Sequence, residues 1–151
     1  MRPTFMFHNH PIRAAGILVQ TVVNGRLLRL FRYINGRAED IGGKTDITDN
    51  NEVDTAVREC VEETNGKLFH KKHTRDECAA VLRGLLVDCP VEYNKRSKYL
   101  LFKLNVDPNI LNQSMKRFGL HEHTERGVLD HYYKWVEHPG HIHPRLFGMK
   151  L

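Results

Sequence analysis

Three glutamates in the middle of the chain, Glu59, Glu62 and Glu63, could do chemistry because they stand close together on a predicted helix. The helix is predicted from Glu52 to Thr64 by apolar residues that recur at helical spacing. These residues are Val53, Ala56, Val57, Cys60 and Val61. At about 100° per residue, the glutamates share the side roughly opposite this stripe, where a divalent cation would offset their mutual repulsion. Carboxylates are hard oxygen ligands that suit Mg²⁺ or Mn²⁺.

The residues around the glutamates decide between this metal site and a simple acidic surface. Charged clusters on exposed helices are usually solvated faces, so that alternative stands if the glutamates are taken alone. Gly42 and Gly43, however, place backbone carbonyls near the start of the helix, and Arg58 directly precedes Glu59. Backbone carbonyls are further oxygen ligands for such a cation.

The segment 43–66 resembles the box of the Nudix hydrolases, G-x5-E-x7-R-E-U-x-E-E-x-G-U, where U is a bulky apolar residue. The R-E-U-x-E-E core is matched at every position by residues 58–63. The resemblance implies an α/β protein, a Nudix-type α/β/α sandwich with a mixed central sheet. It also implies that the three glutamates bind Mg²⁺, or Mn²⁺ as a substitute, together with the carbonyl of Gly43. One of them, or a more distant carboxylate, would orient or deprotonate the attacking water.

The box departs from the family's pattern at two places. The loop after Gly43 holds one extra residue, so the early glutamate, which chiefly anchors the arginine in the family, is missing from its place. The candidates to replace it are the acidic residues Asp49, Glu52 and Asp54. We expect Asp54, four residues before Arg58, to pair with it along the helix. Asn65 stands where the family has glycine, and Asn tolerates a left-handed backbone.

The reaction that the resemblance implies is hydrolysis of a phosphoanhydride in a nucleoside diphosphate linked to another group. Family members often add a metal-binding carboxylate from a later loop, for which Glu125 is favoured here over Glu122. The segment Glu39–Lys44 and the box are also similar to Nudix proteins of large DNA viruses, some of which remove mRNA caps. The expected substrate is therefore capped RNA, a small nucleotide pyrophosphate or an inositol pyrophosphate.

Basic residues indicate an anionic partner. The net charge is +5, and the Lys and Arg residues include three clusters, at 71–75, 95–98 and 116–117. The expected substrate-binding residues are Lys44, Lys95, Arg96 and Lys98. An alternative function uses the same charge differently: a non-catalytic module of this fold that binds RNA or another polyanion through its basic surface.

The histidines, aromatic residues and cysteines are further candidates for metal-binding, base-stacking or disulfide sites. His121, His123, His141 and His143 lack a recognised ligand spacing, so surface or structural roles are favoured over a zinc-stabilised scaffold. Tyr132, Tyr133 and Trp135 are expected in the core rather than stacked on a base. Cys60, Cys78 and Cys89 are an odd set without C-x-x-C spacing, which indicates free thiols. With no signal peptide or membrane span in the sequence, we expect a cytoplasmic or nuclear protein that is not secreted, and protein partners remain open.

The sequence predicts that the elements which position these residues form one domain, residues 1–151. Ile12–Val23 and Arg26–Tyr33 predict a hairpin around Asn24-Gly25, a dipeptide that tolerates the two positive φ angles of a type I′ turn. Ile41–Lys44 is read as a glycine-rich loop before the acidic helix. Further elements are expected along the rest of the chain: a helix from Thr74, a strand at Tyr99–Val106, a helix from Asp107 to Gly119, a strand at Val128–Val136 and a short helix at Pro144–Leu151.

Overall fold

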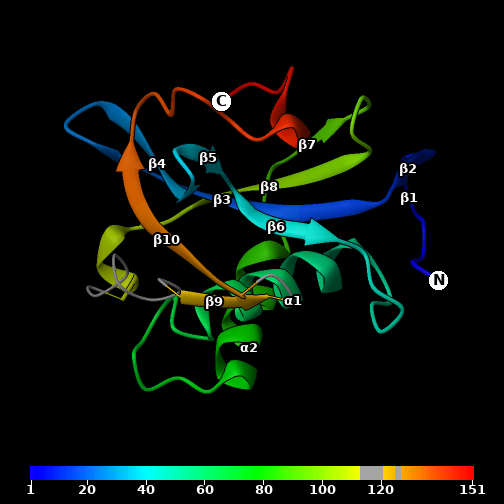
Figure 1. Ribbon diagram of the computed structural model, residues 1–151, viewed down its shortest axis with the longest axis horizontal. Helices are drawn as coiled ribbons and strands as arrows, with labels where there is room; N and C mark the ends of the chain where they lie inside the picture. Colours follow the sequence, from blue (N-terminus) through cyan, green and yellow to red (C-terminus); the bar gives the residue numbers. More distant parts are fainter. Residues whose placement is uncertain (113–120, 125–126) are drawn as a thin grey trace.

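A mixed eight-stranded sheet is the centre of the computed structural model (Figure 1). The structure describes residues 1–112, 121–124 and 127–151, and only the backbone of the described residues between 121 and 131. The strand order is β7-β8-β3-β4-β10-β9, with β5 beside β4 and β6 beside β3. The β3–β8 pair is parallel and the other pairs of the sheet are antiparallel. The expected α/β class with a mixed central sheet is confirmed.

The elements have the following bounds. The strands are β1 (Phe5–Phe7), β2 (His10–Ile12), β3 (Ala14–Val23), β4 (Arg26–Ile34), β5 (Arg37–Glu39), β6 (Ile41–Lys44), β7 (Val91–Asn94), β8 (Tyr99–Asn105), β9 (His121–Thr124) and β10 (Gly127–Val136). The helices are α1 (Glu52–Thr64) and α2 (Arg75–Leu86), with single 3₁₀ turns η1 (Pro108–Ile110) and η2 (Pro144–Leu146). Strands β1 and β2 form a separate two-stranded sheet.

The two faces of the sheet are covered by different parts of the chain. Alternate side chains of β3 point to opposite faces, so Ile17 packs with α1 and α2 whereas Leu18 packs with the C-terminal segment. On that second face Leu146 of η2 completes a buried cluster with strand residues. Figure 1 shows both helices below the sheet and the C-terminal segment above it. None of the helices in the described residues is long and apolar enough to span a membrane.

The hairpin and the acidic helix form where the sequence predicts them. Asn24 and Gly25 have φ values of 51° and 76°, and β3 pairs with β4 across this turn. Asn51 caps α1 with a side chain that accepts from the amide of Asp54, and Asn65 ends the helix with φ 53°. Thr74 begins α2 with the expected capping box.

The glycine-rich segment at 41–44 is a strand, β6, and not the expected loop. Gly42 pairs with Gly16 of β3, and a Cβ on either glycine would lie 2.0 Å from the Tyr99 hydroxyl oxygen. The two backbones therefore approach closely around that hydroxyl, which only glycine permits. As a result Gly43 is held on the sheet, next to α1.

Two expected helices are shorter than predicted. The helix expected from Asp107 to Gly119 begins as the 3₁₀ turn η1, which ends at Leu111 in an extended conformation, and residues 113–120 lie outside the described residues. The terminal helix expected at 144–151 is the single turn η2. Both turns begin with proline, which favours the first turn of a helix and so marks only where a helix starts.

Candidate active site on the acidic helix

Helix α1 directs its three glutamates to different surroundings. The side chain of Glu62 is 50% exposed, that of Glu59 17% and that of Glu63 8%. The expectation that all three lie opposite the buried stripe is therefore wrong for Glu63. Glu63 follows Cys60 by three residues and Ala56 by seven, so it continues the buried stripe towards the sheet.

Glu63 is held beneath the sheet by groups from two strands. Arg32 of β4 donates from Nη1 to Oε1 of Glu63 at 2.9 Å and to Oε1 of Glu39 at 3.4 Å. The hydroxyl of Tyr133 on β10 donates to the backbone carbonyl of Glu63 at 3.1 Å. Among the described residues, the other carboxylate oxygen of Glu63, Oε2, is buried without a hydrogen-bond partner. One oxygen is thus fixed and the second is left available.

Burial sets the proton affinity of both inward glutamates. Removal from water raises the pKa of Glu63 well above its ordinary value, and Arg32 partly offsets the rise. The pKa of Glu59 is raised for the same reason, while Arg58 lowers it. Raised carboxyl pKa values in a cleft are common at catalytic sites, where such groups accept a proton near neutral pH.

Gly43 brings the backbone of β6 against Glu59. A Cβ at Gly43 would lie 2.5 Å from the carboxyl carbon of Glu59, so any side chain there would displace the carboxylate. Glycine at this position keeps a carboxylate and a stretch of backbone in direct contact. That contact brings together two of the expected groups, Glu59 and Gly43.

The oxygen atoms around Glu59 and Glu63 fit a divalent cation only in part. Among the residues whose side chains are described, no three His, Cys, Asp or Glu groups converge as a preformed metal cage. Two features fit a cation nevertheless: the buried Oε2 of Glu63 without a partner, and the backbone of Gly43 packed against Glu59. Carboxylate and backbone carbonyl oxygens are the ligand types that Mg²⁺ and Mn²⁺ prefer. Glu62 would have to leave Arg58 to join them.

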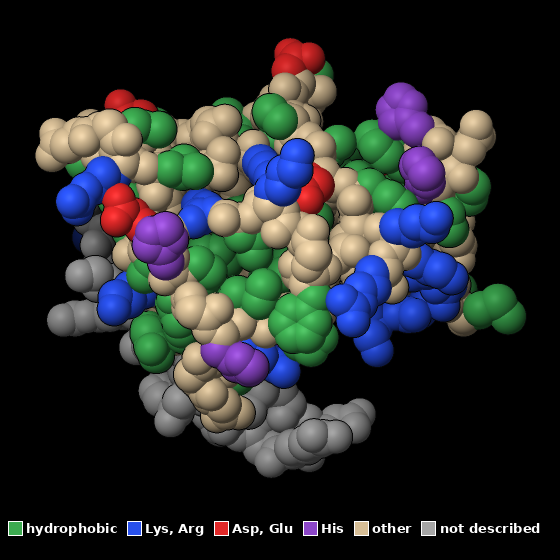
Figure 2. All heavy atoms as spheres, turned by 90° about the horizontal axis from the view of Figure 1, so that it is seen from above, with side chains coloured by type: hydrophobic (Ala, Val, Ile, Leu, Met, Phe, Trp, Pro, Cys, Tyr) green, Lys and Arg blue, Asp and Glu red, His purple; other side chains and the backbone are tan. Residues whose placement is uncertain are grey.

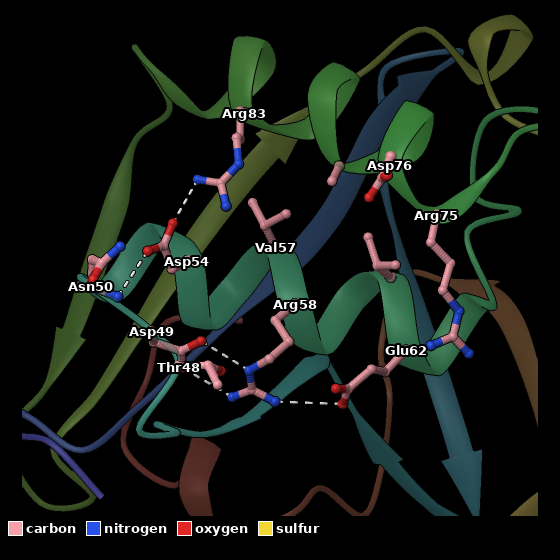
Figure 3. A pocket seen from close by; sticks show the side chains of 12 residues that line it. Thr48, Asp49, Asn50, Asp54, Val57, Arg58, Glu62, Arg75, Asp76 and Arg83 are labelled. Atoms are coloured by element: carbon pink, nitrogen blue, oxygen red, sulfur yellow. Dashed lines mark hydrogen bonds and ion pairs between the residues drawn. The ribbon is translucent and has the colours of Figure 1, made fainter.

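Arg58 is anchored by Asp49 and not by Asp54. Asp49 accepts from Nε of Arg58 at 2.9 Å and from Nη2 at 3.0 Å, a bidentate pair (Figure 3). These bonds outweigh burial, so the pKa of Asp49 is lowered. The expected pair between Asp54 and Arg58 is wrong, because Asp54 pairs with Arg83 of α2 at 2.6 Å and Asp49 binds Arg58 in its place.

The remaining bonds of Arg58 tie the loop to the helix. Its Nη2 donates to the carbonyl of Lys44 at 2.8 Å, and its Nη1 donates to Glu59 at 3.1 Å and to Glu62 at 3.4 Å. Figure 3 shows Asp49 and Glu62 on either side of Arg58 at the rim of a groove between α1 and α2. Arg58 therefore fixes both the end of β6 and two of the glutamates.

A second buried network stands beside the first and was not predicted from the sequence. Asp40 is fully buried, and Arg145 of η2 donates from Nε to its Oδ1 at 2.9 Å. The Tyr99 hydroxyl donates to Oδ2 of Asp40, and the Arg145 guanidinium stacks over the Tyr99 ring at 5.4 Å. These contacts join residues up to 105 positions apart, for which the sequence carries no local signal.

The expected substrate-binding residues divide into two places. Lys44 lines a cavity beside Gly43. Lys95, Arg96 and Lys98 lie in the exposed turn between β7 and β8, where the lining of that cavity is supplied by Ser97 instead. Arg96 lies over the ring of Phe147 at 6.0 Å.

Other candidate residues have the following outcomes. Glu122 lies in strand β9 and not in the expected loop, while Glu125 and the cluster at 116–117 lie outside the described residues. Tyr133 is in the core and Trp135 packs against it, as expected, whereas the exposed Tyr132 stacks on Tyr33. The side chains of His121 and His123 also lie outside the described residues; His141 is exposed, and His143 lines the cavity beside Gly43.

Comparison with known proteins gives a distant structural likeness. No protein-family model matches the chain, and no curated protein matches its sequence. Among solved structures, the chain is similar to Ap4A hydrolase from C. elegans at 20% identity and a TM-score of 0.41, over 83% of this chain and 80% of that one. A binary complex of the same hydrolase matches at 18% identity with the same coverage and TM-score. The chemistry of the site must therefore be inferred from its own residues.

Proposed function

We propose that the chain is a Nudix-type hydrolase that uses Mg²⁺, or Mn²⁺, to cleave a phosphoanhydride bond in a nucleoside diphosphate linked to another group. The observation that carries the proposal is Glu63: a buried carboxylate with one oxygen fixed by Arg32 and the other without a hydrogen-bond partner. Leaving a buried carboxylate oxygen unpaired costs free energy, so such a group is retained where it has a function. The match of residues 58–63 to the Nudix core supports the same chemistry.

The residues that would hold the cation are Glu59, Glu63 and the backbone of Gly43, with Glu62 as a further ligand once it leaves Arg58. A bound divalent cation supplies positive charge that neutralises diphosphate oxygens and makes a water molecule easier to deprotonate. Glu125 remains a proposed additional carboxylate.

The chain's own residues then perform three tasks. Glu63, whose pKa is raised by burial, accepts a proton from the attacking water. Arg32 keeps that carboxylate in one orientation, because the guanidinium bond fixes Oε1. Arg58 holds Glu59 against the backbone at Gly43 while Asp49 holds Arg58. The oxygen of the attacking water bonds to phosphorus as the bond between that phosphorus and the bridging oxygen breaks, and the proton taken by Glu63 is released to solvent. The products from a nucleoside diphosphate linked to another group are two phosphate esters.

The experiment is a substrate screen with matched variants. Capped RNA, dinucleoside polyphosphates such as Ap4A, nucleotide sugars and inositol pyrophosphates are incubated with the protein and Mg²⁺ or Mn²⁺, and the phosphate products are quantified. We expect Glu63→Gln and Glu59→Gln to lower kcat by about 100-fold or more, the scale of a lost proton-transfer or charge-stabilising group. Glu52→Gln, in the first turn of the same helix, is the control and should retain the wild-type rate.

The outcomes separate the enzyme from a binding module. Failure of all substrates, or equal rates for wild type and Glu63→Gln, would overturn the proposal. RNA binding that is strong at low salt, needs no metal and is unchanged in the glutamate variants would instead favour the non-catalytic polyanion-binding function. Cleavage of capped RNA alone would identify decapping as the activity.

A further inference from the structure

A cationic cavity of about 360 Å³ opens at one end of the central strands, beside Gly43. It lies where β3 and β8 begin and β6 ends, and the N-terminal segment and the turn η2 also contribute. The lining residues are Arg2, Arg13, Ala14, Gly43, Lys44, Ser97, Tyr99, His143 and Arg145. Its volume is within the range of small-molecule sites.

The charge of this cavity is not balanced by its surroundings. Four of its lining residues are Lys or Arg and none is Asp or Glu. Arg145 is paired with Asp40, but within the described residues no carboxylate pairs with Arg2, Arg13 or Lys44. Figure 2, which shows the molecule from above, has Lys and Arg side chains gathered at the end where β1 and β2 lie in Figure 1. Several unpaired cations around one hollow favour an anionic ligand.

Arg13 and Lys44 are positioned differently: the side chain of Arg13 is held by hydrogen bonds, whereas only the backbone of Lys44 is held. Arg13 donates from Nη1 to the carbonyl of Arg2 at 2.8 Å and to the hydroxyl of Thr4 at 2.9 Å, which leaves its positive charge without a counter-ion. Lys44 ends strand β6, and its backbone carbonyl is bound by Arg58. The strand end is thus fixed while the ammonium group is exposed.

His143 adds a neutral donor. Its Nδ1 accepts from the backbone amide of Arg145 at 3.0 Å, which leaves the ring proton on Nε2. Burial and the charge of Arg145 lower the pKa of His143 to about 4, so the ring is uncharged at neutral pH. The cavity therefore offers hydrogen-bond donors as well as positive charge.

Gly43 joins the cavity to the proposed catalytic glutamates. It lines the cavity, and its backbone is packed against the carboxylate of Glu59. A substrate whose anhydride lies at Glu59 and Glu63 would therefore reach the cavity past Gly43, near the end of β6.

We propose that the cavity binds a phosphate group additional to the two joined by the scissile bond, so that the substrate is a small polyphosphorylated molecule. This inference rests on the proposed hydrolase function and specifies its substrate class. A neutral leaving group such as a sugar would leave Arg13 and Lys44 unpaired. A cavity of this size favours one phosphate-bearing group over an RNA chain.

The test is calorimetric binding of inorganic tripolyphosphate to the full chain in the presence of EDTA. We expect Lys44→Gln and Arg13→Gln each to weaken binding about tenfold, as expected for loss of one charge-assisted phosphate contact. Arg13→Lys should retain most of the affinity, and Lys72→Gln, an exposed lysine between α1 and α2, should bind as the wild type does. Lys44→Gln keeps the test valid if Arg13→Gln fails to fold, because the Lys44 side chain forms no hydrogen bond with the described part of the chain and its backbone carbonyl bond to Arg58 is kept.

The outcomes distinguish this inference from the hydrolase proposal. Unchanged tripolyphosphate binding in Lys44→Gln and Arg13→Gln would overturn the cavity assignment, even if the protein hydrolyses anhydrides. Weakened binding in those variants, without hydrolysis of any substrate, would support the cavity and reject the hydrolase. An active enzyme that prefers nucleotide sugars or long capped RNA to small polyphosphates would also overturn the assignment.

Discussion

Replacing Arg32 by Gln tests the buried network that holds Glu63. The side chains of Arg32 and Glu63 are 4% and 8% exposed, and Glu39 shares the same guanidinium. Removing one partner of a buried ion pair costs about 3–5 kcal/mol, because the other charge is left unpaired. For a chain of this size that corresponds to a fall in Tm of about 10 °C.

The cost should depend on pH in a defined direction. The pKa values of Glu63 and Glu39 are already raised by burial, and Arg32 lowers both. Without Arg32 they rise further above the unfolded value of about 4.3, so ionisation of these groups destabilises the folded variant as pH rises through its folded pKa values. At pH 5 the carboxyls take up protons and need no cation. The difference between wild type and Arg32→Gln should therefore widen from pH 5 to pH 8.

The assay is urea unfolding at both pH values. Arg26→Gln is the control, since Arg26 forms an exposed pair with Glu137 at 3.5 Å that is worth less than about 1 kcal/mol. The double variant Arg32→Gln with Glu63→Gln should lose about 2 kcal/mol less free energy of unfolding than the sum of the losses in the two single variants. A loss no larger than that of Arg26→Gln, or one that is independent of pH, would refute the reasoning.

Three further predictions follow from the site. Asp49→Asn should lower both activity and stability, the latter by about 1–3 kcal/mol, since it removes the bidentate partner of Arg58; if Asp54→Asn had the larger effect on kcat, the anchor would be misassigned. Mg²⁺ at about 100 times its Kd should stabilise the wild type by about 2.7 kcal/mol in thermal unfolding, and an equal gain in Glu63→Gln would contradict the ligand assignment. The wild type should lose stability as the pH falls from 6.5 to 4, because the folded pKa of His143 is about 4 and the unfolded chain therefore binds the proton at a higher pH. His143→Asn keeps an acceptor for the Arg145 amide and should show a smaller fall in Tm over this range. Identical falls in Tm would argue against a neutral His143.

Local features of the fold could be predicted from the sequence. The hairpin at Asn24-Gly25, the ends of α1 and the capping box at Thr74 depend on residues within a few positions of each other. Of the helix expected from Asp107 to Gly119, only the start at Pro108 was predicted correctly, because the end of the 3₁₀ turn at Leu111 has no comparable local signal.

The contacts of the site were less predictable, for two physical reasons. The pairs of Glu63 with Arg32 and of Asp40 with Arg145 join distant parts of the chain, and only strand pairing brings them together. For Arg58, three acidic partners, Asp49, Glu52 and Asp54, were compatible with the sequence, and the structure selects Asp49. The burial of Glu63 did have a signal, since its spacing from Cys60 continues the apolar stripe.

The most direct test of the central claim is the rate of phosphoanhydride hydrolysis by wild type and Glu63→Gln, measured side by side as Mg²⁺ is raised from an EDTA-treated start. Ap4A and inositol pyrophosphate serve as substrates, and Glu52→Gln is the control. We predict a saturable, Mg²⁺-dependent rate for wild type and Glu52→Gln. For Glu63→Gln we predict a rate that is reduced by about 100-fold or more. Hydrolysis that is independent of Mg²⁺, or equal in wild type and Glu63→Gln, would contradict the assignment of Glu63 to the catalytic centre.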